Sequence, residues 1–489
     1  MLKALTPQAA ANYENIIRRL IPCAIAALVL VSLPVLVIAT GGVFSLTKHG
    51  DPTTGAQRDT NLPRGDCAQC HVSHSGQPFA LFAANTNGLC YTSGCHNLSG
   101  ALAIFQGPAL YDVSSHATST SVLWPGFDST VDASAPRARP SGDSGKCINC
   151  HDPHGYNRDG TGLIPNLVFS REEKLCVVCH DGSPASDVKS QFNKTYKHPI
   201  STTGKHAASE NTSDAFGATP TNNRHSECID CHNAHVAKRE GSPRINTAPD
   251  APNTLRGVSR IAVINGAAGT TPTYTYRGPS DTATPVAEYQ VCFKCHSSWT
   301  TRPAGQSDFA LLFNTNNPSY HPVEAQGKNT NININSFVNN WAATQTMYCS
   351  DCHGNDDPSP LVRGPHGSTY RYLLKNTYTA GSSSRTMASN EICFNCHRYD
   401  TYANDGASST IKGYSRFNPP NWSRGHTYHV GNRRYPCYAC HSSHASTTKP
   451  HLIVTGRSPG LNNYTESTSG GTCSPTCHGS ETYKINYAR

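Results

Sequence analysis

Twenty of the 21 cysteines form ten close pairs, and a histidine directly follows the second cysteine of every pair. Two residues separate the cysteines in eight pairs: Cys67/Cys70/His71, Cys147/Cys150/His151, Cys176/Cys179/His180, Cys228/Cys231/His232, Cys292/Cys295/His296, Cys349/Cys352/His353, Cys393/Cys396/His397 and Cys437/Cys440/His441. Four and three residues separate them in the other two: Cys90/Cys95/His96 and Cys473/Cys477/His478. On a helical turn, residues three apart share a face, so both thiols can reach one flat ligand above the histidine. This spacing predicts covalent attachment of haem c, with the motif histidine as proximal ligand of the iron.

Other uses of paired cysteines explain less of the pattern. A zinc site combines two such pairs and needs no histidine directly after each. A disulfide framework, or a redox-active dithiol, has no use for that histidine either. We therefore expect ten covalently bound haems, each with its iron, on motifs numbered 1 to 10 in chain order. In the two wider motifs we expect the extra residues only to bulge the turn.

The composition indicates that these haems replace an ordinary core. Hydrophobic residues are 36% of the 489 residues, below the usual range, and Gly and Pro number 39 and 33. A short chain can wrap around a large apolar porphyrin held at two sulfurs and one iron. The predicted fold is therefore mostly irregular and loop-rich, with short α-helices wrapped around haems. The formal charge of +8 does not indicate nucleic-acid binding, because there is no basic cluster and the haem propionates would reverse it.

The N-terminal residues have the pattern of an export signal. Lys3, Arg18 and Arg19 precede an apolar run over residues 21–38, and a small residue, Ala39, follows it. Residues 1–39 are therefore expected to be a signal peptide, or an N-terminal signal anchor because the run approaches the length of a spanning helix. Export fits haem c.

The rest of the chain divides into three predicted regions. Residues 40–245 and 291–489 are an N-terminal and a C-terminal five-haem region. Residues 246–290 contain no motif, and their runs Ile261–Ile264 and Thr273–Tyr276 predict a minor β-hairpin in a linker. Loop histidines between motifs 2 and 3, 4 and 5, 6 and 7, and 8 and 9 indicate four two-haem modules, flanked by single haems at motifs 1 and 10.

Histidines outside the motifs are candidates for the second, distal ligand of each iron. Nine recur at module positions or three residues after a motif histidine: His74, His116, His154, His198, His235, His321, His366, His426 and His444. A tenth ligand would come from His49, His225, His451 or another subunit. The sequence has only three Met residues, so His/Met ligation cannot be general. A histidine three residues after a motif histidine projects to a similar side, so it is expected to ligate a different haem.

These residues resemble the multihaem c-type cytochromes of dissimilatory metal-reducing bacteria, which have doubled Cys-x-x-Cys-His motifs. The most specific segment is Arg224–His235, R-H-S-E-C-I-D-C-H-N-A-H, with His198-Pro199 upstream. The resemblance implies a multihaem cytochrome architecture and a conductive chain of haems. It implies no substrate and no enzymatic activity. The alternative is a multihaem reductase of nitrite, hydroxylamine or a sulfur oxyanion, which would need one iron with an open coordination position.

The resemblance also implies partners and a location. Similar proteins pass electrons through other multihaem cytochromes and outer-membrane conduit proteins to metal oxides or electrodes outside the cell, and some polymerise into filaments. We therefore expect an exported protein at the outer surface or outside the cell rather than in the periplasm, anchored in the membrane if residues 1–39 are retained. A homopolymer is one expected assembly, and nucleic acid is not an expected partner.

Overall fold

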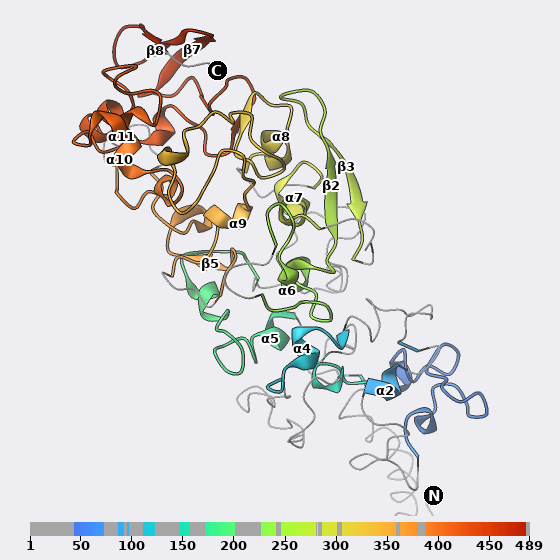
Figure 1. The fold of residues 1–489 in the computed structure, drawn as a ribbon. Coiled ribbons are helices and arrows are strands. Elements are labelled where there is room, and N and C mark those ends of the chain that lie inside the picture. Colours follow the sequence, from blue (N-terminus) through green and yellow to red (C-terminus); the bar gives the residue numbers. More distant parts are fainter. Residues whose placement is uncertain are drawn as a thin grey trace, which may run out of the picture. The chain divides into compact units, whose positions relative to one another are not determined.

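The computed structural model describes residues 44–72, 87–91, 95–96, 111–122, 147–155, 168, 172–200, 226–240, 246–279, 281, 286–300, 306–357, 362–379 and 387–485 (Figure 1). The predicted signal segment, His74 and His225 lie outside these residues. The chain groups into two compact units, Met1–Cys95 with Cys150–Ser170, and His96–Asn149 with Arg171–Arg489. This grouping differs from the division predicted at residues 246–290, which fall within the second unit.

The prediction of a loop-rich fold with short helices is confirmed. The longest described helix, α7, has nine residues. The α-helices are α2 (Asn87–Cys90), α4 (Ser115–Thr118), α5 (Glu172–Cys176), α6 (Cys228–Cys231), α7 (Glu288–His296), α8 (Phe309–Phe313), α9 (Cys349–Cys352), α10 (Tyr399–Tyr402) and α11 (Ser409–Gly413). The 3-10 helices are η1 (Phe44–Leu46), η2 (Cys67–Gln69), η3 (Cys147–Asn149), η5 (Ser190–Asn193), η6 (Asn253–Leu255), η7 (Ile334–Ser336), η8 (Arg371–Leu373), η9 (Ile392–Asn395) and η11 (Cys437–Ala439), and η10 (Thr427–Asn432) is a π-helix. No described helix combines the length and the apolar character needed to cross a membrane.

Small antiparallel sheets join segments that are far apart in the sequence. The strands are β1 (Tyr196–Lys197), β2 (Arg260–Ile264), β3 (Thr273–Arg277), β4 (Ser319–Tyr320), β5 (Gly367–Ser368), β6 (Ala445–Ser446), β7 (Leu461–Ser467), β8 (Gly470–Pro475) and β9 (Glu481–Lys484). Strand β1 pairs with β5, β2 with β3, and β4 with β6, while β7, β8 and β9 form one three-stranded sheet. Histidines flank both two-residue pairs: His198 and His366 flank β1–β5, and His321 and His444 flank β4–β6.

The predicted β-hairpin is present. Strand β2 pairs with β3 over five residues, from Arg260 opposite Arg277 to Ile264 opposite Thr273. Helix α7 packs against β2, beside the hairpin in Figure 1. Ile261 on β2 is completely buried. Since α7 carries motif 6, the hairpin supports a motif rather than only linking two regions.

Two small hydrophobic clusters lie against motif cysteines. The first contains Phe293, Phe313 and Tyr320, with the Cys349 and Cys352 side chains packed on it. In the second, the Tyr464 and Tyr483 side chains pack together, and Cys440 and Cys473 line its edge. Apolar packing in the second unit is therefore distributed along the motifs.

Candidate haem sites

Most motifs fold into a single tight turn. In six of them the backbone N–H of the motif histidine donates a 2.9–3.0 Å hydrogen bond to the carbonyl oxygen of the first cysteine: His71, His180, His232, His353, His397 and His441. This is the i to i−4 bond of an α-helix, made once. The cysteines three residues apart therefore project to one side, as thioether attachment to one porphyrin requires.

Acidic residues inside or just before the motifs start these turns. Asp230 and Asp351 are the third residues of motifs 5 and 7. Their carboxylates accept 2.8 Å hydrogen bonds from the backbone N–H groups of Glu227 and Tyr348, respectively. In motif 1, Asp66 accepts a 2.8 Å bond from the Ala68 N–H. Such caps satisfy backbone groups that a four-residue turn cannot satisfy itself.

Seven motif histidines among the described residues face a second histidine at nearly constant distance. The ring centroids lie 5.9 Å apart for His71 and His154, 6.2 Å for His180 and His116, 5.9 Å for His232 and His366, 6.3 Å for His296 and His198, 6.2 Å for His353 and His444, 6.2 Å for His441 and His426, and 6.2 Å for His478 and His429. An eighth, His397, is close enough to His321 for their charges to interact.

These distances fit one iron between each pair. Two imidazoles that bind a metal ion from opposite sides through Nε2, each at about 2 Å, have ring centroids about 6 Å apart. Rings that merely packed against each other would not keep one centroid distance in seven pairs whose interplanar angles range from 5° to 70°. The residues present therefore fit bis-histidine haem.

Motif 3 has the same local form as motifs 1 and 9, with a 3-10 helix over its first three residues. The motif histidine then forms an isolated antiparallel bridge in motifs 3, 7 and 9: His151 with Val168, His353 with Leu374, and His441 with Ile453. In motif 3 the helical turn does not continue from His151 to His154. The division between the two compact units also falls inside this motif, between Asn149 and Cys150.

The prediction that His154 serves a motif other than motif 3 does not depend on such a turn. His154 faces His71 of motif 1, so it does lie against a motif other than the one it follows. The facing pairs given above do not include His151 of motif 3 or His96 of motif 2. Their roles as proximal ligands therefore stay predictions from the Cys-x-x-Cys-His spacing.

The other ring nitrogen is engaged by the protein in most of the paired histidines. Nδ1–H donates to a carbonyl oxygen in His116 (Ala234, 3.0 Å), His198 (Pro365, 2.6 Å), His232 (Thr254, 2.9 Å), His321 (Ser443, 2.6 Å), His353 (Tyr372, 2.8 Å), His429 (Gly425, 2.9 Å) and His441 (His451, 2.9 Å). Because a carbonyl can only accept, Nδ1 carries the proton and Nε2 keeps its lone pair for a metal. Such bonds also fix the ring orientation.

Burial favours the neutral imidazole that a metal requires. It is the main cause that lowers the pKa of His366, His426 and His444 to about 3. It also lowers the pKa of His180 and His198 to about 4. These rings therefore need no deprotonation before they bind iron at neutral pH.

Two pairs of distal candidates are held by a repeated arrangement, which we call the histidine clasp. His198 follows β1 and His366 precedes β5, and these strands pair with Tyr196 opposite Ser368. Likewise, His321 follows β4 and His444 precedes β6, with Ser319 opposite Ser446. In both clasps Nδ1–H of the first histidine donates to the carbonyl oxygen of the residue just before the second. One clasp therefore positions two histidines for two different motifs.

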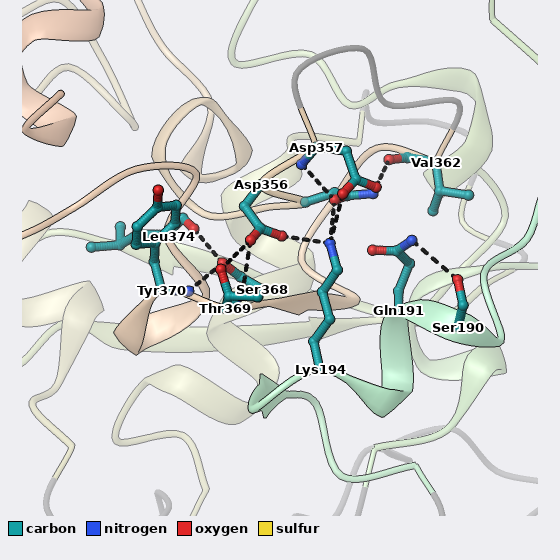
Figure 2. Close-up of polar contacts among 11 residues, drawn as sticks. Ser190, Gln191, Lys194, Asp356, Asp357, Val362, Ser368, Thr369, Tyr370 and Leu374 are labelled. Carbon is teal, nitrogen blue, oxygen red and sulfur yellow. Dashed lines mark hydrogen bonds and ion pairs between the residues drawn. The ribbon is translucent and has the colours of Figure 1, made fainter.

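An ion-pair network fixes the clasp of His198 and His366. Figure 2 shows Lys194, which follows η5, reaching toward Asp356 and Asp357. Its Nζ lies 2.5 Å from an Asp356 oxygen and 3.1 Å from an Asp357 oxygen. The other Asp356 oxygen accepts a 3.0 Å bond from the Thr369 N–H, just beyond β5. Burial alone would raise the pKa of Asp356, but the bonds from Lys194 and Thr369 outweigh it and lower the pKa to about 2.

Cysteines of consecutive motifs lie side by side. The side chains of Cys292 and Cys349, the first cysteines of motifs 6 and 7, lie close enough to interact, as do those of Cys393 and Cys437 in motifs 8 and 9. Second cysteines interact electrostatically with the following motif: Cys70 with Cys90 and Cys95, Cys231 with Cys292, Cys352 with Cys393, and Cys440 with Cys473 and Cys477. The spatial order of motifs 5 to 10 is therefore their chain order.

The remaining predicted ligands are placed as follows. His49 lies with Nδ1 3.1 Å from the Pro153 carbonyl oxygen. The ring of His235 is 6.0 Å from that of Tyr111. His451 directs Nε2 to a Glu466 carboxylate oxygen at 2.7 Å.

Two residues with a place in these sites were not predicted. His429 faces His478 of motif 10, and its spacing of three residues after His426 was the available signal. Phe337 lies in an Asn-rich run over residues 329–340, and its ring stacks 5.5 Å from the His397 ring. Its neighbour Val338 donates a 2.8 Å backbone bond to Cys396, so this run braces motif 8.

Motif 10 differs from the expected bulged turn. Cys473 lies on strand β8, opposite Tyr464 of β7 and Glu481 of β9, and Cys477 lies just beyond the end of the strand. Two strand partners hold Cys473 extended, and the extra residue of the spacer allows the chain to turn only after Pro475.

No group of three or more His, Cys, Asp and Glu side chains in the described ranges could hold a metal ion on its own. The doubled CXXCH motif family matches residues 60–100, 141–185 and 342–401. Searches of curated proteins and of solved structures found no match.

The three matches group the motifs differently from the predicted modules. They join motif 1 with 2, 3 with 4, and 7 with 8, whereas the loop histidines had indicated pairs of motif 2 with 3 and 8 with 9. In the structure, a loop histidine need not face the motifs beside it in the chain, since His198, between motifs 4 and 5, faces His296 of motif 6. The matched motifs indicate covalently bound haem c and support a multihaem c-type cytochrome that transfers electrons.

Proposed function

We propose that this protein carries ten haem c groups and conducts electrons along them, with two histidine ligands on each iron and no substrate of its own. The repeated 5.9–6.3 Å distance between a motif histidine and a second histidine is the observation that carries this proposal. Haem supplies reversible one-electron chemistry when bound. The chain attaches it, supplies both ligands, and excludes other ligands from the iron.

The arrangement of the cysteines supports conduction. Sulfurs close enough to interact, such as those of Cys292 and Cys349, would hold the edges of two porphyrins next to each other. The motif histidines of motifs 4 and 5, His180 and His232, also interact electrostatically. We infer an uninterrupted path along motifs 4 to 10 in chain order, and a second close pair at motifs 1 and 2.

The donor and acceptor follow from the resemblance and are part of the same proposal. The protein would be exported, with residues 1–39 as signal or anchor, and would act at or beyond the outer surface. Its partners would be other multihaem cytochromes, outer-membrane conduit proteins or further copies of itself in a filament. Metal oxides or electrodes would be the terminal acceptors.

An EPR spectrum of the oxidised protein, recorded beside its intact mass, tests the proposal. We expect a mass increase of ten haems and only low-spin ferric signals, with no binding of nitrite. A stoichiometric high-spin haem that binds nitrite would favour the reductase. A count of eight haems would show that the two wider motifs carry none.

A further inference from the structure

The hydrogen bond that defines the histidine clasp occurs at five places among the described residues. In the two clasps with paired strands, it joins His198 to the residue before His366, and His321 to the residue before His444. The same bond joins His116 to Ala234, which precedes His235, at 3.0 Å. The fourth joins His49 to Pro153, which precedes His154, at 3.1 Å. The fifth joins His429 to Gly425, which precedes His426, at 2.9 Å.

Each clasp serves motifs in a fixed order. The first histidine of a clasp faces an even-numbered motif: His116 faces His180 of motif 4, His198 faces His296 of motif 6, and His321 interacts with His397 of motif 8. The second histidine faces the odd-numbered motif just before it: His366 faces His232 of motif 5, and His444 faces His353 of motif 7. The fifth clasp follows the same order, because His429 faces His478 of motif 10 and His426 faces His441 of motif 9. A clasp therefore joins motif 5 to 6, 7 to 8, or 9 to 10.

The fourth clasp fits this order at its second histidine. His154 faces His71 of motif 1, with the rings 5.9 Å apart and nearly parallel. The first histidine of that clasp should then serve motif 2. Cys70 of motif 1 interacts electrostatically with Cys90 and Cys95, so motif 2 is adjacent. The family match over residues 60–100 also joins these two motifs.

We infer that His49 is the distal ligand of the haem on Cys90 and Cys95. The inference rests on the proposed function. It selects His49 over His74, which the sequence had ranked higher because it lies three residues after His71. The Nδ1–H of His49 donates the bond to Pro153, so Nδ1 carries the ring proton and Nε2 has the lone pair that an iron ligand requires. His49 lies in a turn that directly follows the short 3-10 helix η1. In this turn the Thr47 hydroxyl accepts a 2.9 Å hydrogen bond from the Gly50 N–H.

The test compares His49→Ala with His74→Ala in the full-length, haem-loaded protein. We expect His49→Ala to convert one of ten haems to high-spin in the oxidised EPR spectrum, and added imidazole to restore the low-spin signal. His74→Ala should leave all ten low-spin. Ten low-spin haems in His49→Ala, or a high-spin haem in His74→Ala instead, would overturn the inference.

A second background identifies the haem. A Cys90→Ala/Cys95→Ala protein should carry nine haems by mass, and adding His49→Ala to it should create no high-spin signal. A high-spin signal in that background would place His49 on another iron. If His49→Ala does not load haem, His49→Met should give one haem with His/Met ligation, seen as a raised potential for a single haem. The wild-type spectrum tests the proposed function separately, because ten low-spin haems there support conduction whichever histidine serves motif 2.

Discussion

His426 and His429 lie three residues apart at the start of the π-helix η10, and they face two different motif histidines. The His426 ring lies 6.2 Å from that of His441, and the His429 ring lies 6.2 Å from that of His478. A π-helix has more residues in each turn than an α-helix, so residues three apart diverge more widely around its axis. One turn can therefore serve motifs 9 and 10.

Replacing either histidine should affect only its own motif. In His429→Ala, the haem on Cys473 and Cys477 should become high-spin, while in His426→Ala the haem on Cys437 and Cys440 should change. Electron transfer through the C-terminal end should slow in both. EPR of the oxidised variants, each combined with loss of the cysteines concerned, assigns the signal.

His451→Ala is the matched control for these two variants. Its Nε2 contacts Glu466, so its loss should leave every haem low-spin. The same high-spin signal in all three variants would mean that unfolding of this region, rather than ligand loss, is being observed.

His444 follows motif 9 but faces motif 7. In His444→Ala, the haem attached beside His441 should remain six-coordinate, and the haem attached beside His353 should become high-spin, because the His353 and His444 rings are 6.2 Å apart and nearly parallel. EPR with the cysteines of motif 7 removed would show this. A high-spin haem at motif 9 would contradict the clasp model.

Lys294 should raise the potentials of the haems on motifs 5 and 6. This ammonium is 1% exposed, and it donates to the Asp230 carbonyl oxygen at 2.5 Å and the Ser259 hydroxyl at 3.2 Å. It interacts electrostatically with Cys231 and Cys295. A nearby cation disfavours ferric iron, which carries one more positive charge than ferrous iron.

Lys294→Met should therefore lower two of the ten potentials, by tens of millivolts as an order of magnitude. Spectroelectrochemical titration measures this, with the exposed Lys328→Met as control. Potentials that rise or stay constant in Lys294→Met would show that this charge is compensated locally.

Glu324 should make stability depend on pH. Burial raises its pKa from 4.5 to about 7, although its Oε2 accepts a 2.8 Å bond from Asn265. A raised carboxyl pKa means that the folded state holds the proton more tightly, so stability is lost as pH rises from about 4.5 through about 7. Glu324→Gln should be more stable than wild type at pH 8, by on the order of 2 kcal/mol, and similar near pH 4. Thermal unfolding at both pH values, with the exposed Glu481→Gln alongside, checks the sign.

Asp356 should make the protein less stable at low pH, whereas Glu324 makes it less stable at high pH. Its pKa is lowered from 3.8 to about 2, so its contribution is complete above 3.8 and is lost as pH falls through about 2. Asp356→Asn should destabilise the clasp of His198 and His366 at neutral pH by about 1 kcal/mol and remove this acid dependence. Asp357→Asn, whose side chain is 48% exposed, should have a smaller effect. Equal losses in both variants would contradict the role assigned to Asp356.

The sequence by itself determined where haem attaches and what kind of fold results. Two thiols and a histidine within five residues act locally, so their chemistry can be recognised without knowing the rest of the structure. Low hydrophobic content with ten such motifs predicted the loop-rich fold, and the runs Ile261–Ile264 and Thr273–Tyr276 predicted the hairpin. The Cys473 motif shows the limit of local inference, because pairing with β7 and β9 placed it on a strand.

Only the tertiary structure decided which histidine faces which motif. His198 lies between motifs 4 and 5 yet faces motif 6, and His444 follows motif 9 yet faces motif 7. These partners are brought together by strand pairs between residues more than a hundred positions apart, such as Lys197 with Gly367 and Tyr320 with Ala445. A distal ligand must approach its iron from the face that the motif leaves open, and spacing along the chain carries no information about which segment crosses that face.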